Sequence, residues 1–562
     1  MGRLFNALKD VFGGKEDEDS GDETTDVDAQ NLSHVGAAAY ECLRTVHEDV
    51  HHVTWDVTSG KVVGELDQTP KGCFDLEDDP PEGHSDWLPE KMAGIMERTE
   101  QWCDVMSLGP PDGKFLECMK QALVKVNARA SGDKPVVFRF LFGNIPGMPV
   151  NCGKVLKSLT ADLPDDPSIL LWVGAWRNGV SWNHAKIIAV DGRYLHTGGH
   201  NLWDPHYLKN CPVHDLSFEL EGKVAHAAHL FANDHWKYIE AKQRHFIGKI
   251  VDLMPDSLPM VLKARVTVSE YPDDEAGEFP PKYKKRLVPR YTRLPDSVPL
   301  ISVGRRGQLH TKDNSSDDAF VAMIESANTI LRLGLQDLGP VCIPKTKLAL
   351  PGCTWPHTYL ESLAKVIWEK GVDVEIVLSN PGSIPGGLSM KDANYGNGWS
   401  CVDVAAEIIK KIKKLYPDAD DDQLRQKVAD NLRVCFIRTA TGNQWSDGNS
   451  KGMHAKHFIV DDVCCYIGSQ NLYVCDLSEW GVIVDDVETT QRIKAEYWDP
   501  MWKFSYTGDD VDVQEVMDGL DIDRDGEDPA NLSAEQLAEA ARAQTHCPNT
   551  DFCNDHDSDV ED

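Results

Sequence analysis

The sequence predicts an α/β fold made of two related lobes. Two observations predict it: apolar strand candidates alternate with helical patterns, and one short motif occurs twice, far apart in the chain. The alternation indicates a largely buried sheet covered by helices. Because 41% of the 562 residues are hydrophobic, the chain can bury more than one core. The clearest segments of the first lobe are strands at Val136–Phe142 and Ile169–Val173 and helices at Lys91–Cys103 and Phe115–Asn127.

The repeated motif is the second observation. His184-Ala-Lys186-Ile-Ile-Ala-Val-Asp191 returns as His454-Ala-Lys456-His-Phe-Ile-Val-Asp461, so both copies read H-x-K-x4-D. The two copies are followed at the same spacing by Gly198-Gly199-His-Asn201 and by Gly468-Ser469-Gln-Asn471. A single H-x-K-x4-D arises easily by chance. Two copies with matching flanks instead favour one active site assembled from two lobes.

Composition limits the class of function. The formal net charge of -34 disfavours a nucleic-acid-binding protein, because binding to phosphates needs a basic surface. No nucleic acid partner is therefore expected. The 15 cysteines are odd in number and follow no disulfide framework, which favours a reduced setting. No stretch approaches the roughly 20 apolar residues of a membrane span, and the start lacks the apolar core of a signal peptide. We therefore expect a cytoplasmic monomer, with peripheral membrane contact left open.

The domain organisation follows from shifts in composition. The second lobe should contain helices at Asp317–Ala327, Leu360–Lys370 and Val402–Lys414 and a buried strand at Val372–Leu378. The expected segments are an amphipathic start and disordered acidic linker over 1–34, an N-terminal lobe over 35–250, a basic, Pro-rich connection over 251–297, a C-terminal lobe over 298–506, and an acidic, mostly disordered tail over 507–562.

Two segments leave alternatives open. The apolar residues between Leu4 and Phe12 share one helical face, which fits either an interfacial membrane helix or a short helix docked on the protein. The basic run Lys282–Arg293, with Arg305 and Arg306 after it, fits either contact with anionic lipid headgroups or a solvated linker paired with the acidic surface.

The acidic tail contains two weak metal-binding patterns. Asp521–Gly526 resembles the start of a calcium loop, but Leu532 stands at the twelfth position, where a bidentate Glu is needed, so a solvated acidic turn is expected. The spacing of the histidines and cysteines between His546 and His556 matches no common metal site. We predict no metal ion and no cofactor.

Each copy of the motif is expected on a β-hairpin. Residues two apart on a strand point to the same face, so the histidine and lysine of each motif would lie side by side. The turns should fall at Asp191-Gly192 and Asp461-Asp462. Six residues should serve the backbone of the motif rather than the chemistry: Asp191, Asp461, Gly198, Gly199, Gly468 and Ser469.

The residue types fit an attack on a phosphodiester. Imidazole has an unperturbed pKa of about 6.5, so one histidine can attack phosphorus while the other protonates the departing alcohol. Lys186 and Lys456 would place ammonium groups at the non-bridging oxygens of the phosphate. Asn201 and Asn471 would add neutral donors to the same oxygens.

Both histidines need a carboxylate that fixes their tautomer and orientation. Asp215 and Glu479 each stand at the start of another apolar strand candidate. Asp215 follows His184 along the chain, and Glu479 follows His454. We therefore predict that Asp215 orients His184 and that Glu479 orients His454.

These residues resemble the phospholipase D superfamily with its paired HKD motifs, and most closely its compact actinomycete-type members. The resemblance covers roughly residues 85–506 and implies two α/β/α sandwich lobes related by a pseudo-twofold axis, with the site at their junction. The similar stretches are Ser181-Trp-Asn-His184, Thr197-Gly-Gly-His-Asn201 with Trp203 and Tyr207, Pro212-Val-His-Asp215, Leu335-Gln-Asp-Leu338, Tyr466-Ile-Gly-Ser-Gln-Asn-Leu-Tyr473 and Asp499-Pro-Met-Trp-Lys503.

The resemblance also implies roles for individual residues. His184 would be the nucleophile and His454 the general acid and base. Trp203, Tyr207 and Trp399 would face a choline-like headgroup, because an aromatic cage attracts a quaternary ammonium. Ordinary core packing is the alternative for each of these rings.

The chain departs from the family pattern in three respects. Family members are secreted, whereas no signal peptide is found here. His200 replaces a common apolar residue, and Glu479 stands where Asp is frequent. The first departure bears on localisation and physiological substrate, and the other two bear on headgroup preference.

The implied function is that of a phospholipase D acting at a membrane surface. Such an enzyme hydrolyses the distal phosphodiester of a glycerophospholipid such as phosphatidylcholine to phosphatidic acid through a phosphohistidine, with transfer to alcohols as a side activity. The alternatives are a cardiolipin-synthase-like transferase, a nuclease and a non-catalytic lipid-binding protein. Cardiolipin-synthase-like enzymes usually have membrane segments, which this sequence lacks. A nuclease needs a basic groove for its substrate, which the net charge disfavours. The two intact motifs argue against a non-catalytic lipid-binding protein.

Overall fold

The computed structural model describes residues 31–522, apart from 132–135, 146–148, 180, 210, 244–266, 272–279, 285–293, 308–313, 341–353, 382, 386–393, 396–398, 473–476 and 521. The predictions for the amphipathic start, the acidic linker, the calcium-like turn and the cluster between His546 and His556 lie outside the described residues.

One continuous sheet of sixteen strands runs through both lobes. At its centre, β1 (Trp55–Thr69) pairs antiparallel with β10 (Val298–Arg305). In the first lobe the sheet continues from β1 through β8 (Asp215–Gly222), β7 (Tyr194–Gly198), β6 (Ile187–Val190), β2 (Trp102–Ser107), β3 (Val136–Gly143) and β4 (Ile169–Asn178). In the second lobe it continues from β10 through β18 (Glu479–Val484), β17 (Cys464–Gly468), β16 (Lys456–Val460), β11 (Ile330–Leu335), β12 (Asp373–Leu378) and β15 (Leu432–Phe436).

The two halves of the sheet have the same pairing pattern. In both, two hairpin strands run antiparallel and are followed by three mutually parallel strands: β2, β3 and β4 in the first lobe, and β11, β12 and β15 in the second. The antiparallel β1–β10 pair lies between the halves, where a twofold axis would relate them. This order confirms the predicted α/β fold of two pseudo-twofold-related lobes. Four short strands lie outside the repeat. β5 (Ser181–Trp182) and β9 (Thr267–Tyr271) pair with β4, and β13 (Ile384–Pro385) pairs with β14 (Asn394–Tyr395) in a small separate sheet.

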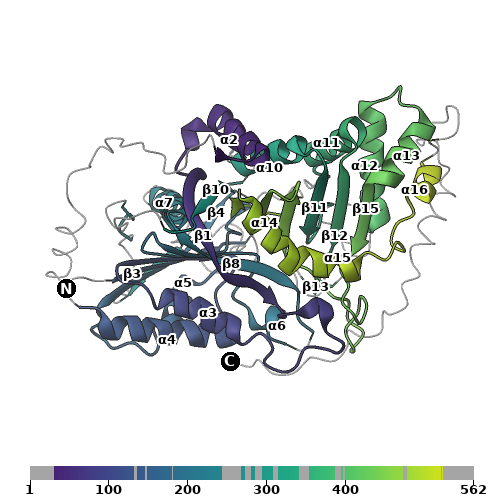
Figure 1. Cartoon of the computed structure of the whole chain (residues 1–562). Coiled ribbons are helices and arrows are strands. Elements are labelled where there is room, and N and C mark those ends of the chain that lie inside the picture. Colours follow the sequence, from purple (N-terminus) through teal and green to yellow (C-terminus); the bar gives the residue numbers. More distant parts are fainter. Residues whose placement is uncertain are drawn as a thin grey trace.

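Helices cover both faces of the sheet (Figure 1). Around the first lobe lie α3 (Trp87–Met96), α4 (Gly113–Arg129), α5 (Cys152–Leu159) and α7 (Val224–Gln243). Around the second lobe lie α2 (His34–Val46), α10 (Ser315–Ser326), α11 (His357–Lys365) with the π-helical turn η5 (Val366–Lys370), α12 (Cys401–Leu415), α13 (Asp421–Asn431), α14 (Val487–Ile493) with η6 (Lys494–Trp498), and α15 (Asp499–Ser505).

One hydrophobic core joins the lobes. It contains Trp102 and Leu141 from the first lobe together with Val377, Ile459 and Trp480 from the second. A second core belongs to the first lobe alone, and a third combines the second lobe with residues of α2 and β1. The shared core holds the two lobes in a fixed relation, which a site built from both of them requires.

The helix predicted over Lys91–Cys103 is wrong at its end. The helix α3 stops at Met96, and Trp102 already begins strand β2. The carboxylate of Asp191 accepts the backbone N–H groups of Glu100, Gln101 and Trp102 at 2.7–2.9 Å. A contact from a residue so far along the chain overrides the local helical pattern.

Two residues of the basic stretch, Tyr283 and Arg305, are buried. Tyr283 is buried and stacks on His229 with ring centroids 4.1 Å apart. Arg305 lies on the central strand β10 and forms a buried ion pair with Asp317 at 2.8 Å. These residues fill the interior, while residues 285–293 lie outside the described part of the chain.

Ordered structure extends past the predicted end of the second lobe. The helix α16 (Val513–Gly519) buries Val516 and Met517 in the second-lobe core. Its N-terminus is capped by Asp512, whose side chain accepts the N–H of Gln514. Among the helices of residues 31–522 that the structure describes, none has the length and apolarity needed to cross a bilayer.

Candidate active site

The two motifs lie on equivalent hairpins with matching turns. Asp191 and Gly192 have φ angles of 51° and 65°, and Asp461 and Asp462 have φ angles of 51° and 56°. Two consecutive left-handed residues form the tight turn that matches the twist of a hairpin, and Asp tolerates this conformation better than most residues. The turns join β6 to β7 and β16 to β17, as the sequence predicts.

The motif aspartates hold neighbouring backbone rather than the histidines. Asp461 accepts the N–H groups of Asn328, Thr329 and Ile330 at 2.8–3.0 Å, as Asp191 does in the first lobe. Each aspartate therefore ties its hairpin turn to the segment that enters the neighbouring strand. These contacts are of the kind expected for structural members of the motif.

Short backbone bridges join the lobes beside the motifs. The N–H of His184 donates to the carbonyl of Ser478 at 2.8 Å, and the N–H of His454 donates to the carbonyl of His214 at 2.7 Å. Both acceptors stand one residue before a predicted orienting carboxylate, and both belong to the opposite lobe. The bridges bring each histidine next to the carboxylate strand of the other lobe.

The carboxylates accordingly pair in a crossed manner. His184 Nδ1 lies 2.8 Å from Glu479 Oε2, and His454 Nδ1 lies 2.8 Å from Asp215 Oδ2. The prediction that Asp215 orients His184 and Glu479 orients His454 is therefore wrong in its pairing, although both carboxylates lie in the site. The interlobe bridges are the physical reason, because they exchange the partners between lobes.

Both histidine–carboxylate pairs are almost fully buried. His184 and His454 are 2% and 5% exposed, and their ring centroids are 6.2 Å apart at an interplanar angle of 69°. The rings do not stack on one another. Each leaves its Nε2 edge unused by the carboxylate contact.

Burial and charge set the protonation states. Burial lowers the pKa of His184 to about 4 and lowers the pKa of His454 well below its usual range. Burial alone would raise the pKa of Asp215 and of Glu479, but His454 and His184 outweigh it and hold both carboxyl pKa values low. An ionised carboxylate only accepts, so Nδ1 of each neutral imidazole carries the proton and Nε2 keeps its lone pair.

The two lysines lie beside the histidines of their own motifs. Lys186 Nζ donates to the carbonyl of His184 at 2.6 Å, and Lys456 Nζ donates to the carbonyl of His454. Burial lowers the pKa of Lys456 to about 8. Burial, with the nearby charge of Lys456, lowers the pKa of Lys186 well below its usual range. Two buried ammonium groups so close together favour binding of an anion between them.

Each orienting carboxylate has a hydroxyl donor. Tyr207 Oη donates to Asp215 Oδ2 at 2.8 Å, and Ser469 Oγ donates to Glu479 Oε2 at 2.6 Å. Sequence reasoning assigned neither donor role. Ser469 is among the residues predicted to be structural, but nothing in the sequence shows that it meets the carboxylate of Glu479.

Tyr207 supports an orienting carboxylate, and its predicted contact with a headgroup stays a prediction. Its side chain is fully buried, and its hydroxyl also accepts the N–H of Asn201 at 3.0 Å. Trp203 and Trp399 are partly buried. Their indole N–H groups donate to the carbonyls of Pro110 and Pro340 at 3.1 and 2.7 Å, respectively. These two rings also remain aromatic candidates for substrate contact.

The motif glycines allow close approach. A Cβ at Gly199 would lie 1.9 Å from Asp215 Oδ1, and a Cβ at Gly198, whose φ is 149°, would lie 2.4 Å from the Cα of Ser217. A Cβ at Gly468 would lie 2.1 Å from Tyr466 Oη. The first glycine pair therefore makes room for the carboxylate that reaches over from β8 to the histidine of the other lobe.

The predicted amide donors are buried beside the motifs. Asn201 and Asn471 are each 1% exposed. Asn471 Nδ2 donates to Gln336 Oε1 at 3.4 Å, a contact that sequence reasoning missed. Gln336 is fully buried at the end of β11, in a stretch that resembles the superfamily but carries no recognisable functional pattern.

His200 has a structural explanation. Its Nδ1 lies 2.7 Å from Ser217 Oγ and its Nε2 lies 2.7 Å from Thr69 Oγ1, so the ring bridges strands β8 and β1. Burial lowers the pKa of His200 to about 4, and its ring meets Tyr207 edge to face at 4.9 Å. The polar residue therefore fills the place of an apolar one without an unpartnered ring nitrogen.

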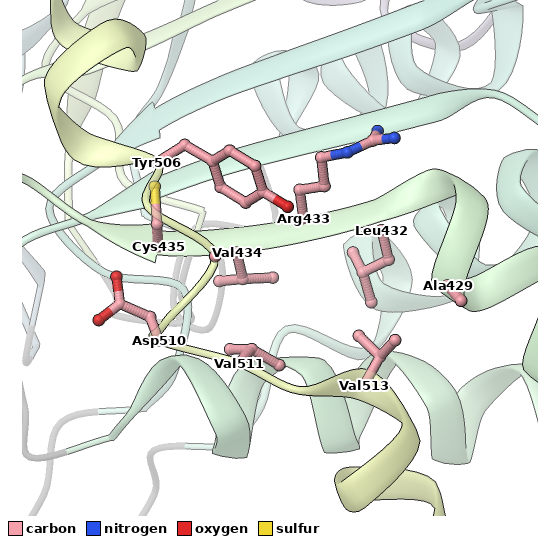
Figure 2. Close-up of a pocket in the computed structure, with 10 residues that line it drawn as sticks. Ala429, Leu432, Arg433, Val434, Cys435, Tyr506, Asp510, Val511 and Val513 are labelled. Atoms are coloured by element: carbon pink, nitrogen blue, oxygen red, sulfur yellow. The ribbon is translucent and has the colours of Figure 1, made fainter.

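A separate hollow lies away from these residues. Figure 2 shows it between β15, the end of α13 and the segment that follows Tyr506, with Asp510 and Val513 at its wall. Its lining contains neither motif. Apolar side chains such as Val434 and Val511 make up much of it, and we assign it no role in the chemistry.

The chain is similar to a curated protein and to solved structures. No protein-family model matches the chain. A curated phospholipase D of Streptomyces antibioticus is 25% identical over 481 residues, which cover 80% of this chain and 82% of that protein. The solved phosphatidylserine synthase of Haemophilus influenzae aligns at 11% identity with a TM-score of 0.47, covering 90% of this chain and 98% of that one. The Salmonella typhimurium phospholipase D family member Nuc aligns at 17% identity with a TM-score of 0.18, covering 33% and 86%.

The duplicated hairpins meet at one buried pair of histidines, with one histidine from each lobe. Over most of its length, the chain is similar to a protein of the phospholipase D type.

Proposed function

We propose that this protein is a phospholipase D that hydrolyses the distal phosphodiester of a glycerophospholipid such as phosphatidylcholine. The products are phosphatidic acid and the free headgroup alcohol. The observation that carries the proposal is the buried pair His184 and His454, each oriented by a carboxylate of the opposite lobe. The long alignment with a protein named phospholipase D supports the lipid substrate.

In the first step His184 attacks phosphorus through Nε2, because its Nδ1–H is held by Glu479. The P–O bond to the headgroup breaks, and the departing alkoxide takes a proton from Nε2 of His454. That histidine must be protonated when substrate is bound, and the negative phosphodiester between the rings raises its pKa for this purpose. Reacting atoms need to approach to about 3–3.5 Å, which a phosphoryl group between rings 6.2 Å apart can satisfy.

In the second step water attacks the phosphohistidine. His454, now neutral, takes a proton from the water, the new P–O bond forms, and the P–N bond to His184 breaks. An alcohol can replace water in this step and give a transphosphatidylation product. Hydrolysis and transfer therefore share one intermediate.

The surrounding groups stabilise the charge on phosphorus. Lys186 and Lys456 can turn from the backbone carbonyls that they now bind toward the non-bridging oxygens of a bound phosphate. Asn201 and Asn471 add amide donors in the same buried region. Fixed donors in a water-poor site stabilise developing charge more strongly than donors in water do.

The substrate test uses vesicles of phosphatidylcholine with and without ethanol. The wild-type protein is expected to release choline and phosphatidic acid, and to form phosphatidylethanol when ethanol is present, in buffer containing EDTA. His184→Ala and His454→Ala should each lose more than about 1,000-fold in turnover of phosphatidylcholine. The proposal fails if the wild-type protein forms neither lipid product.

The roles of the two histidines can be separated with a substrate whose leaving group needs no acid, such as a p-nitrophenyl phosphodiester. His454→Ala should release nitrophenol once and retain a labelled phosphohistidine, because the base for the second step is missing. His184→Ala should form no labelled protein. Labelling of His184→Ala but not of His454→Ala would reverse the two roles.

The same protein can be tested on other substrates, and each result would point to a different function. Transfer to phosphatidylglycerol without hydrolysis would indicate a cardiolipin-synthase-like enzyme. Cleavage of labelled single-stranded DNA would indicate a nuclease. The described residues favour neither: Arg305 and Arg306 of the basic stretch are engaged by Asp317 and Asp234. A lipid substrate also requires peripheral contact with a membrane surface.

A further inference from the structure

Two adjacent histidines and an aspartate converge near the start of β1, outside the two-histidine site. His51 and His52 follow the short helical turn η2 (Glu48–Val50), and Asp56 is the second residue of β1. His51 Nε2 lies 3.4 Å from Asp56 Oδ1, and His52 Nδ1 lies 3.0 Å from Asp56 Oδ2. The three ligand atoms all lie within 4.8 Å of one another.

Packing holds the three side chains in this arrangement. The rings of His51 and His52 stack with centroids 3.7 Å apart, and His51 also stacks on Trp55 at 4.3 Å. His52 adopts a left-handed backbone with a φ of 61°, and its N–H donates to the carbonyl of Trp55 at 2.8 Å. The turn therefore presents both imidazoles to one carboxylate, and one stacked ring must rotate about its side-chain bonds before both nitrogens can point at one ion.

The cluster is accessible from solvent on its histidine side. The Asp56 side chain is only 11% exposed. The imidazole side chains are 28% and 54% exposed, so an ion can enter directly from solvent.

We propose that His51, His52 and Asp56 bind a divalent transition-metal ion such as Zn²⁺. Two nitrogen ligands and one carboxylate are a donor set of zinc, with water in the fourth position. Donors on a tetrahedral ion with bonds near 2.1 Å lie about 3.4 Å apart. His51 Nε2 lies 3.4 Å from one oxygen of Asp56, and His52 Nδ1 lies 3.0 Å from the other. Imidazole ligands disfavour Ca²⁺ and Mg²⁺, which take oxygen donors.

The position of the site suggests a structural role. Asp56 pairs with Ser302 of β10 in the sheet register, so the ion would fasten the turn after η2 to the strand pair at the junction of the lobes. Metal that binds only the folded state stabilises it. The site shares no residue with the proposed catalytic machinery, so this inference does not depend on the proposed function.

The test is calorimetric titration of ZnCl₂ into the full chain after removal of metal with EDTA and exchange into chelator-free buffer. We expect the wild type to bind one equivalent of Zn²⁺. The affinity for Zn²⁺ should fall at least tenfold in Asp56→Asn and in the double variant His51→Ala/His52→Ala. His357→Ala removes an exposed histidine from the start of α11 and serves as the matched control, which should bind as the wild type does. Bound Zn²⁺ should raise the melting temperature of the wild type and of the control, but not of the two cluster variants.

Cobalt distinguishes this site from the cysteines of the chain. Co²⁺ on nitrogen and oxygen ligands gives visible d–d absorption without an intense thiolate-to-metal charge-transfer band. We expect such a spectrum in the wild type and its loss in Asp56→Asn, which keeps the shape of the side chain if the double variant fails to fold. The inference is overturned if Asp56→Asn binds Zn²⁺ as tightly as the wild type, or if the Co²⁺ spectrum is that of a thiolate site and persists in the variant.

Discussion

His454 Nδ1 lies 2.8 Å from Asp215 Oδ2, although the two residues belong to different lobes. His184 and Glu479 are related in the same way. Neither motif histidine pairs with a carboxylate of its own lobe. The interlobe bridges at Ser478 and His214 therefore matter to the chemistry as much as the motifs do.

The crossed pairing predicts which histidine each carboxylate variant disturbs. Asp215→Asn should change the imidazole ¹⁵N resonances and tautomer of His454 and leave those of His184 close to wild type. Glu479→Gln should do the reverse. Each variant should lower turnover on the order of 10³-fold, because the wrong tautomer is no longer excluded. A change centred on His184 in Asp215→Asn would contradict the pairing.

The pKa shifts predict a bell-shaped dependence of kcat/KM on pH. His184 must be neutral to attack, and its pKa of about 4 gives the acid limb: activity falls as the pH drops below this value. Lys456 must be charged, and its pKa of about 8 gives the alkaline limb: activity falls as the pH rises above it. Lys456→Arg should move the alkaline limb upward, since a guanidinium stays charged. If only Lys186→Arg moves that limb, Lys186 is the titrating group.

Gly199 is predicted to tolerate no side chain. In Gly199→Ala the new Cβ would lie 1.9 Å from Asp215 Oδ1 and force that carboxylate away from His454. We expect at least a 100-fold loss of turnover and about 1–3 kcal/mol lower unfolding free energy in urea titrations. Gly94→Ala in α3, where a Cβ meets nothing within 4 Å, is the matched control and should keep wild-type activity. Equal behaviour of the two variants would rule out the steric argument.

Tyr207→Phe separates a positioning role from a headgroup role. Loss of the hydroxyl removes a donor to Asp215, so kcat should fall by roughly 3–30-fold to a similar degree for choline, ethanolamine and serine headgroups. KM for each lipid should stay near its wild-type value. Ser469→Ala removes the corresponding donor to Glu479 and should behave alike. A loss confined to phosphatidylcholine would instead return Tyr207 to the headgroup site.

Local patterns in the sequence were sufficient to predict most elements of the fold. The strand predicted at Val136–Phe142 is β3 with one further residue, and the helix predicted at Phe115–Asn127 is α4 with two more residues at each end. Apolar periodicity and turn residues determine such segments directly. The helix predicted over Lys91–Cys103 failed because the carboxylate of Asp191, distant in sequence, fixes the backbone there.

In the candidate site too, some features follow from the local sequence and others depend on tertiary packing. The motif residues and both orienting carboxylates follow from residue types and spacing. The exchange of carboxylates between lobes does not, because Asp215 and Glu479 occupy equivalent places and either pairing satisfies the local sequence. The hydroxyls of Tyr207 and Ser469 were missed for a related reason: donor contacts depend on packing between strands that the sequence does not order.

The pairing of each histidine with a carboxylate of the other lobe also determines when the site can be completed during synthesis. The ribosome makes His184 well before Glu479, which starts the last strand of the sheet. A nascent chain that has finished its first lobe carries a histidine without its partner and a carboxylate, Asp215, without its own. The growing polypeptide therefore has no complete histidine–carboxylate pair of the site until nearly all of the sheet has been translated.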